Sequence, residues 1–146
     1  MARAVIAITG TPGTGKSFLA RQYVRKGYTL IDLKRLVQQK KIPRGYDKKR
    51  KCWTVDPKQM TNVVQKLLKT TKGNVVVEGH LSHYLLPRYV TQCIVTRCSL
   101  KTLHKRLKRR GYRKSKIDEN LESEIMEIII SEAREIGHKV KVVKTG

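Results

Sequence analysis

The sequence predicts an α/β fold built on a parallel sheet, and three observations support this prediction. Short apolar runs alternate along the 146 residues with longer segments of helical pattern. Residues 75–77 are consecutive valines, as in a strand that is buried on both faces. A glycine-rich loop joins the first apolar run to the first helical segment. A chain of this length is expected to form one domain, residues 1–146, with a single core.

The expected strands are the apolar or β-branched runs at residues 4–9, 28–31, 75–78, 92–96 and 140–143. Helical patterns lie between them. The first helix covers residues 17–25 and ends near Gly27. Asp32 caps a small helix that ends before Pro43. The buried stripe of this small helix is expected to be Leu33, Leu36 and Val37.

The later elements follow from similar signals. Residues 43–53 are basic and turn-prone, and they are expected to be part of an insertion. The pair Asp56-Pro57 starts a helix, because it places a cap before a proline at the first helical position. Ser99 caps a basic helix that Gly111 closes. Apolar spacing in the acidic segment predicts one amphipathic helix, whose single buried face consists of Ile117, Leu121, Ile125, Ile128 and Ile129.

The glycine-rich loop has the pattern GxxxxGK[ST], and it lies between a strand and a helix, as a phosphate-binding P-loop does. Its glycines let backbone amides approach a phosphate at a helix N-terminus, where the dipole also favours an anion. Lys16 is expected to contact the β- and γ-phosphates of ATP, and Ser17 to offer its hydroxyl to Mg²⁺. The expected ATP-binding residues are Gly10, Pro12, Gly13, Thr14, Gly15, Lys16, Ser17, Phe18 and Arg106.

Two polar residues follow the valine run. Glu78 ends a strand where ligands gather in open α/β sheets, so it is expected to be a second group near Mg²⁺. His80 is expected to orient a water or the attacking oxygen, or to contact the loop that senses the γ-phosphate. The alternative for His80 is an ordinary histidine at a strand end. The other histidines have no companion residues and are expected to be structural: His83, His104 and His138.

Arg106 and Arg110 lie four residues apart on one face of the basic helix. This spacing suits a mobile arginine clamp over phosphates that undergo transfer. Because the helix is basic throughout, RNA binding or simple solvent exposure is the alternative for each arginine. The expected catalytic residues are Lys16, Glu78, His80, Arg106 and Arg110.

The charge is strongly and unevenly basic. With 33 Lys and Arg against 11 Asp and Glu, the net charge is +22, which favours a polyanion such as RNA over plain solvation. Basic residues concentrate at 40–51 and 101–116, and most acidic residues at 118–135. Tyr46 and Trp53 flank the first basic block. They could stack on a base or anchor the insertion to the core, and anchoring is the favoured interpretation.

The three cysteines form no CxxC pair and have no clustered histidines, which argues against a zinc site and for a reducing compartment. No segment approaches the roughly 20 apolar residues of a membrane span. The expected location is cytoplasmic, or nuclear if the source is a eukaryote.

The P-loop and the later motifs of this sequence resemble those of the adenylate kinase isoenzyme 6 family, also called the CINAP-type factors. The resemblance covers nearly the whole chain. The P-loop alone is shared with many kinases and with AAA-type ATPases. The Arg-Gly-Tyr run with a downstream Asn and Glu is much more specific. The matching positions are residues 10–17, 45–47, Glu78, His80, 106–112, Glu119, Asn120 and Glu124.

The resemblance implies a three-layer P-loop NTPase fold of the nucleoside monophosphate kinase type, with five parallel strands in the order 2-3-1-4-5. It implies a core of residues 1–32 and 71–146, a monophosphate-binding insertion near 33–70 and a short lid near 110–117. The implied activity is adenylate kinase, with AMP as the acceptor, together with ATPase activity. Members also assemble the small ribosomal subunit during rRNA maturation, which implies a ribosomal protein of the S-eleven kind as a partner. A monomer is expected.

Three features depart from the family pattern. Glu78 stands where Asp is usual, and Gln38 stands where the insertion helix usually carries an arginine. Lys34, Arg35 or Arg44 is a candidate substitute for that arginine. The sequence stops at residues 144–146, about where the base-contacting loop of the family continues, so adenine recognition is expected to be incomplete.

Two functions therefore stay open: an enzyme that moves a phosphoryl group from ATP to AMP, and an ATP-driven assembly factor. A basic RNA-binding protein that uses its P-loop only as a nucleotide-sensing switch is the alternative. A GTPase is disfavoured because no Asn-Lys-x-Asp motif is present. An AAA-type ATPase is disfavoured because its helical lid and sensors would need a longer chain.

Overall fold

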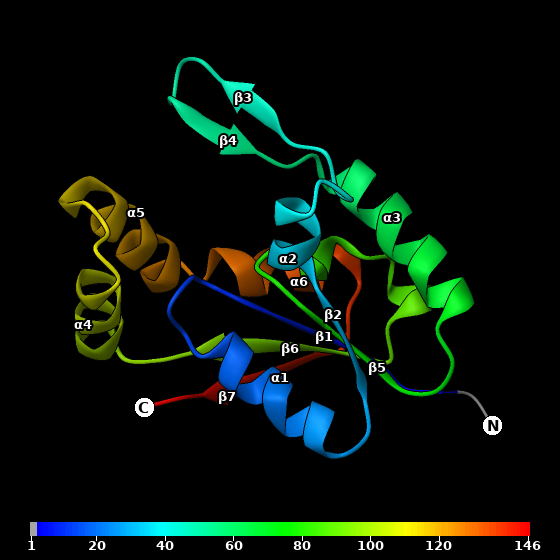
Figure 1. Ribbon diagram of the computed structural model, residues 1–146. Helices are drawn as coiled ribbons and strands as arrows, with labels where there is room; N and C mark the ends of the chain where they lie inside the picture. The colour runs from blue at the N-terminus through cyan, green and yellow to red at the C-terminus, as the bar shows by residue number, and fades with distance from the viewer. Residues whose placement is uncertain (1–2) are drawn as a thin grey trace.

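The computed structural model describes residues 3–146, so residues 1 and 2 of the predicted domain lie outside it. Its centre is one sheet in which all neighbouring strands run parallel (Figure 1). The order is β2-β5-β1-β6-β7, which is 2-3-1-4-5 when only the strands of this sheet are counted. The predicted topology is therefore confirmed. The strands are β1 Val5–Gly10, β2 Thr29–Asp32, β5 Val75–Glu78, β6 Gln92–Arg97 and β7 Val140–Lys144.

Helices cover both faces of the sheet and complete three layers. They are α1 Lys16–Arg25, α2 Leu33–Gln38, α3 Pro57–Thr70, α4 Leu100–Arg109, α5 Lys114–Ile125 and α6 Ile128–Ile136, with short 3-10 turns at Ser82–Tyr84 and Pro87–Tyr89. Helix α1 packs on one face through Ala20, which contacts the side of β1 that carries Ile6 and Ile8. Helices α3 and α6 cover the opposite face. None of these helices within residues 3–146 is long and apolar enough to cross a membrane.

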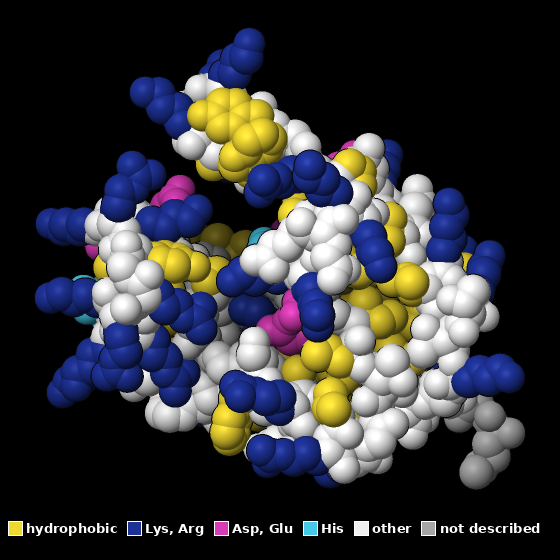
Figure 2. Space-filling model, viewed as in Figure 1, with side chains coloured by type: hydrophobic (Ala, Val, Ile, Leu, Met, Phe, Trp, Pro, Cys, Tyr) yellow, Lys and Arg dark blue, Asp and Glu magenta, His cyan; other side chains and the backbone are white. Residues whose placement is uncertain are grey.

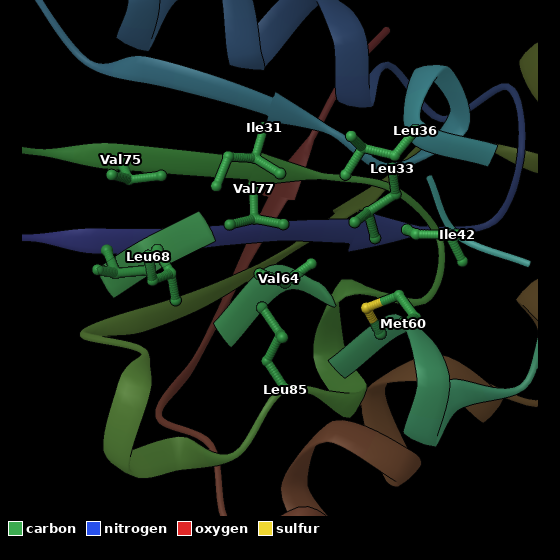
Figure 3. Close-up of a cluster of buried hydrophobic side chains, with 11 residues drawn as sticks. Ile31, Leu33, Leu36, Ile42, Met60, Val64, Leu68, Val75, Val77 and Leu85 are labelled. Carbon is green, nitrogen blue, oxygen red and sulfur yellow. The ribbon is translucent and has the colours of Figure 1, made fainter. Parts of the chain in front are cut away.

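The largest buried cluster lies between the sheet and α3 (Figure 3). Met60, Val64 and Leu68 recur at helical spacing, so α3 presents one apolar face to Val75 and Val77 of the sheet. Truncating a buried side chain such as Met60 to alanine typically costs about 2–5 kcal/mol. Leu33 and Leu36 of α2 join the same cluster, as predicted, and Val37 is partly buried beside them. This packing fixes α2 and α3 against the sheet whose carboxyl edge carries the candidate site.

Residues 43–53 contain an element that the sequence did not predict. Strands β3 Gly45–Asp47 and β4 Cys52–Thr54 form an antiparallel hairpin that projects from the body (Figure 1). Tyr46 and Trp53 are 51% and 58% exposed. The prediction that these two aromatic residues anchor the insertion to the core is therefore wrong, because the hairpin strands contact chiefly each other.

The single late helix is also a wrong prediction. The chain forms two helices, α5 and α6, which meet at Glu127 in a left-handed conformation with φ 52°. Because the chain changes direction at Glu127, the apolar residues of α6 do not continue the buried face of α5. Ile125 is 62% exposed, whereas Ile130 is buried. Ala133 of α6 then packs against the sheet beside Ala7 and Cys93.

Candidate active site

The P-loop leaves β1 at the sheet edge where β5 also ends. Ile8 and Glu78 are register partners, so the loop after β1 and the residues after β5 start side by side. Gly10 has φ 148°, and a Cβ atom there would lie 2.4 Å from Thr96 Oγ1 of the neighbouring strand. Gly13 has φ 91° and touches the apolar side chains of α4. Only glycine fits both positions, so the loop path depends on them.

Side chains inside the loop hold its shape. Thr14 is buried, and its Oγ1 donates a hydrogen bond to Thr11 O at 2.6 Å and lies 2.7 Å from Thr96 Oγ1. The predicted contact of Thr14 with ATP can therefore involve only its backbone. Helix α1 begins after Gly15, whose φ of 97° turns the chain and which offers no side-chain cap. The first amides of α1 are thus available to an anion.

Lys16 folds back over this loop. Its Nζ donates hydrogen bonds to Gly10 O at 2.9 Å and to Thr11 O at 3.3 Å. Burial, together with the positive charges of Arg110 and Lys34, lowers the pKa of Lys16 to about 8 from the usual 10.5. Several cations therefore face one small volume, which favours the entry of an anion such as a phosphate.

Ser17 and Glu78, the two residues predicted to hold Mg²⁺, contact each other. Ser17 Oγ donates a hydrogen bond to Glu78 Oε1 at 2.9 Å, and Glu78 is only 8% exposed. The negative charge of Glu78 also opposes the lowering of the Lys16 pKa. A hydroxyl and a carboxylate at one point suit Mg²⁺, which prefers oxygen ligands and takes the others from phosphates and water. The residues present therefore fit this ion.

His80 lies beside this group, with its ring exposed at the surface of the site. Desolvation by the surrounding protein lowers the pKa of His80 to about 4, and the charge of Lys16 acts in the same direction. Because His80 is exposed, desolvation accounts for only part of the lowering of its pKa. The positive charge of Lys16 lowers the same pKa. His80 is therefore neutral at pH 7, and it can orient a polar group without adding charge.

The two arginines of the expected clamp lie in different environments. Arg106 Nη1 donates hydrogen bonds to Gly13 O at 3.0 Å and to Thr145 Oγ1 at 3.2 Å, so it is docked on the P-loop. Arg110 is exposed, and its guanidinium has no hydrogen bond or ion pair within residues 3–146. Arg110 nevertheless lies close enough to Lys16 to affect its pKa.

An open cavity of about 410 Å³ lies beside the loop, where α1 meets the end of β7. Phe18 and Arg106 both line it, and Phe18 is exposed. The cavity has the size of a small-ligand site, so both residues are placed where a nucleotide could contact them. Its lining residues are Gly15, Phe18, Leu19, Gln22, Arg106, Val143, Lys144, Thr145 and Gly146.

Thr145 is a site residue that sequence reasoning missed. Its amide donates to Arg97 O at 2.7 Å, and its hydroxyl donates to Thr14 O. A signal that could have found it is its position two residues after the last predicted strand, because carboxyl ends of parallel strands meet at one edge.

Glu124 matched the family pattern without a predicted role, and it proves to contact the loop. The carboxylate is buried and accepts hydrogen bonds from Thr11 Oγ1 and Cys98 N, both at 3.3 Å. Arg97 Nε lies 3.6 Å from Glu124 Oε2, the oxygen that also accepts from Cys98 N. Helix α5 is thereby tied to the P-loop.

The remaining predicted residue, Pro12, is partly buried at the turn of the loop. Figure 2 shows the face that carries the site: it is hollowed between the hairpin, the α4–α5 side and the body of the molecule. Lys and Arg side chains gather around this hollow, with Asp and Glu side chains beside it. The arrangement can hold a polyphosphate and one divalent cation.

Comparison with known proteins extends this result. Residues 6–127 match the family described as "AAA domain". The "Adenylate kinase isoenzyme 6 homolog" of Caenorhabditis elegans is 34% identical over 131 residues, which are 89% of this chain and 72% of that protein. A "Putative adenylate kinase" of Pyrococcus furiosus is 39% identical over 142 residues, 97% of this chain and 74% of that protein.

Among solved structures, a shikimate kinase from Acinetobacter baumannii in complex with shikimate superposes with a TM-score of 0.64 at 14% identity, over 99% of this chain and 86% of that one. At that identity the likeness shows the fold alone. The sequence relatives are closer and cover most of both chains. The chain therefore belongs to the AAA domain family and, more narrowly, to the adenylate kinase isoenzyme 6 family, and its P-loop core is that of a nucleotide kinase.

Proposed function

We propose that this protein transfers the γ-phosphoryl group of ATP to AMP and also hydrolyses ATP, as a factor in assembly of the small ribosomal subunit. The observation that carries the proposal is the convergence of Lys16, the Ser17–Glu78 pair and Arg110 at one sheet edge. Four groups from α1, β5 and the end of α4 thus surround the position where a phosphate would bind.

On the donor side, the amides of the loop and Lys16 hold the β- and γ-phosphates. Bound Mg²⁺, held by Ser17 and Glu78, would supply positive charge to the phosphate oxygens. Arg106 fixes the loop through Gly13 O and faces the cavity where the nucleotide would extend. Arg110 has no partner in residues 3–146 and is free to bind the phosphoryl group during transfer.

On the acceptor side, Lys34 of α2 is the best candidate to replace the arginine that the family pattern places at Gln38. Lys34 acts on the Lys16 pKa, so its charge reaches the phosphate site, whereas Arg44 lies over the Trp53 ring. We propose that the insertion 33–70 binds AMP in this way. The connection 110–117 is then the lid that brings Arg110 over the phosphates and excludes water.

Hydrolysis uses the same site with water as the acceptor. The bond from the γ-phosphorus to its bridging oxygen breaks and ADP leaves, while the water oxygen bonds to the phosphorus and a proton of the water passes to an oxygen of the phosphate that forms. Neutral His80 is positioned to orient this water by a hydrogen bond. AMP attacks through an anionic phosphate oxygen and does not depend on a group that orients water. His80 is therefore expected to matter more for hydrolysis than for kinase turnover.

The assembly role is supported by the net charge of +22, which suits an rRNA partner. A basic ribosomal protein of the S-eleven kind would instead bind the acidic segment. Part of that segment is engaged internally: Glu124 and Glu127 pair with Arg97, and Glu132 contacts His83. The exposed carboxylates that could meet such a partner are Asp118, Glu119, Glu122 and Glu135, of which Glu119 also pairs with Lys116 at 4.0 Å. Charge reversal at these four positions that leaves partner binding intact would contradict this part of the proposal.

The first test is ATP consumption by the purified protein with and without AMP, with ADP and free phosphate measured separately. A rise with AMP that yields two ADP per event, and that Lys16→Ala abolishes, is the expected result. Free phosphate without an effect of AMP would contradict the kinase part and leave a partner-regulated ATPase.

A further inference from the structure

The hairpin β3–β4 carries an aromatic pair that the fold leaves exposed. Tyr46 and Trp53 are register partners on the two strands, and their rings meet edge to face with centroids 5.1 Å apart. The pair stabilises the hairpin from one side. Figure 2 shows hydrophobic side chains on the visible face of the hairpin, with Lys and Arg side chains around them. An exposed aromatic surface is thus presented to solvent within a basic region.

The positive charge of this region is not neutralised. None of its cations takes part in an ion pair within residues 3–146. The two carboxylates nearest in sequence accept hydrogen bonds from backbone amides instead. Asp47 accepts from the amides of Lys49 and Arg50 at 3.0 and 3.2 Å, and Asp56 caps α3. The exposed cations are Lys40, Lys41, Arg44, Lys48, Lys49, Arg50 and Lys51.

One of these cations, Arg44, is stacked on the Trp53 ring. The guanidinium carbon of Arg44 lies 4.5 Å from the centroid of the Trp53 ring. Arginine on an indole face, next to a second exposed ring, is the combination on which unpaired bases stack, while lysines nearby bind phosphates. An acidic peptide would use the lysines but would leave the rings without a role. A duplex would also leave them unused, because its bases are already stacked.

We propose that the hairpin β3–β4, residues 44–54, binds a single-stranded nucleic acid, with Tyr46 and Trp53 stacking on bases and the surrounding Lys and Arg side chains on phosphates. The proposal rests on the RNA partner in the proposed function and names the surface that binds it. The hairpin lies inside the insertion 33–70 that we propose binds AMP, but it contains neither Lys34 nor any residue assigned to ATP binding or catalysis. Single-stranded RNA and single-stranded DNA share this chemistry, and the test compares them.

Trp53 makes the test direct, because it is the only tryptophan in the chain. Titration with an oligouridylate of about ten nucleotides, a length within the site sizes of such proteins, is expected to quench its fluorescence. Anisotropy of the labelled oligonucleotide is expected to show about tenfold weaker binding for Trp53→Ala, the scale of one base stack, and near wild-type binding for Trp53→Phe. The same oligonucleotide as DNA is expected to bind, and as an RNA duplex to bind more weakly.

A charge-matched pair of variants separates the hairpin from the overall field. Lys48→Gln/Lys49→Gln changes the hairpin turn, and Lys66→Gln/Lys69→Gln removes the same charge from exposed positions on α3. Only the first is expected to weaken binding and to reduce the slope of log K against log salt, by roughly 0.7 for each phosphate that the protein no longer neutralises.

The outcomes distinguish this inference from the proposed function. RNA binding without quenching, and unchanged in Trp53→Ala and in the Lys48/Lys49 variant, would overturn the hairpin site while leaving the RNA partner in place. No RNA binding by the wild-type protein would overturn both. ADP formation from ATP and AMP by the wild-type protein, measured without nucleic acid, tests the kinase reaction separately.

Discussion

Ser17 and Glu78 are 61 positions apart in the chain, yet Ser17 Oγ donates a hydrogen bond to Glu78 Oε1 at 2.9 Å. The contact joins the first turn of α1 to the end of β5. It forms because β1 and β5 are parallel neighbours, so the loop after one strand lies above the end of the other. A largely desolvated carboxylate is thereby held beside a hydroxyl that also borders the phosphate loop.

The first prediction is that Glu78→Gln lowers Mg²⁺-dependent ADP formation by about 10–100-fold, because the amide keeps the shape but loses the charge that attracts the ion. A titration of turnover against Mg²⁺ concentration should show a higher apparent requirement. Glu78→Asp keeps the charge and should retain most of the activity. Glu135→Gln makes the same change at an exposed position of α6 and should behave as wild type. Superimposable titrations for Glu78→Gln and Glu135→Gln would contradict the assignment.

The second prediction concerns the pH dependence of ATP binding. The pKa of Lys16 in the free protein is about 8, so the ammonium group that binds phosphate is lost as the pH rises through that value. ATP affinity, measured by calorimetry without Mg²⁺, should therefore fall above about pH 8. Lys16→Arg stays charged throughout this range and should show a much flatter profile, even if its affinity is lower. Parallel profiles for the two proteins would show that another group titrates.

The third prediction is a gain in stability when Lys16 is replaced. Its folded-state pKa is lowered, so between about pH 8 and 10.5 the unfolded chain binds more protons, and the free energy of unfolding rises with pH. At pH 7 the lysine is charged in both states, and its partial burial is a cost. Lys16→Met should therefore raise the free energy of unfolding by about 1 kcal/mol without nucleotide, while removing ATP binding. Urea unfolding measures this, with the exposed Lys66→Met as the control. A lower value for Lys16→Met than for the control would contradict it.

Much of the fold could be predicted because its signals are local. Glycines end helices at positions that need a positive φ, as Gly27 does after α1. Asp32 accepts the amide of Arg35 at 3.2 Å, as a cap should. The strand order came from the family resemblance, since apolar runs alone do not specify which strands are neighbours.

The wrong predictions concern features with no local signal. The break at Glu127 has neither glycine nor proline, and it is supported by Arg97, which bonds Glu127 Oε1 at 3.0 Å and Glu124 O at 2.7 Å. These contacts come from β6, which is distant in sequence. The hairpin strands are three residues each, too short for a clear alternation. Within the site, the P-loop could be predicted because its residues are contiguous in the sequence. Thr145 and Glu124 are distant in sequence and are brought to the loop only by the tertiary fold.

The fourth prediction separates the two clamp arginines. Arg110→Ala should lower kcat by about 10²–10³-fold, as loss of a group that stabilises transferring charge does, while leaving the free energy of unfolding within about 0.5 kcal/mol. Arg106→Ala should weaken ATP binding and also destabilise the fold by about 1 kcal/mol, because Gly13 O loses its charged donor. Arg109→Ala, on another face of α4, is the control. Equal effects on kcat from Arg109→Ala and Arg110→Ala would mean that only the overall charge of the helix matters.

The last prediction tests the link between α5 and the P-loop. Glu124→Ala removes a buried carboxylate and leaves Thr11 Oγ1, Cys98 N and part of the Arg97 guanidinium without an acceptor. The free energy of unfolding should fall by about 3 kcal/mol, and ATP affinity should fall with it, because Thr11 belongs to the loop.

Glu127 provides the matched control for this change, because it pairs with the same arginine at 3.0 Å from an exposed position. Glu127→Gln should cost less than about 1 kcal/mol and leave ATP affinity unchanged. A double-mutant cycle of Glu124→Ala with Thr11→Val should give a coupling energy of about 0.5–1 kcal/mol in stability. If the two single changes are additive in both stability and ATP affinity, the hydrogen bond between Thr11 and Glu124 does not transmit the effect, and Glu124 acts on the fold through Arg97 and Cys98 N.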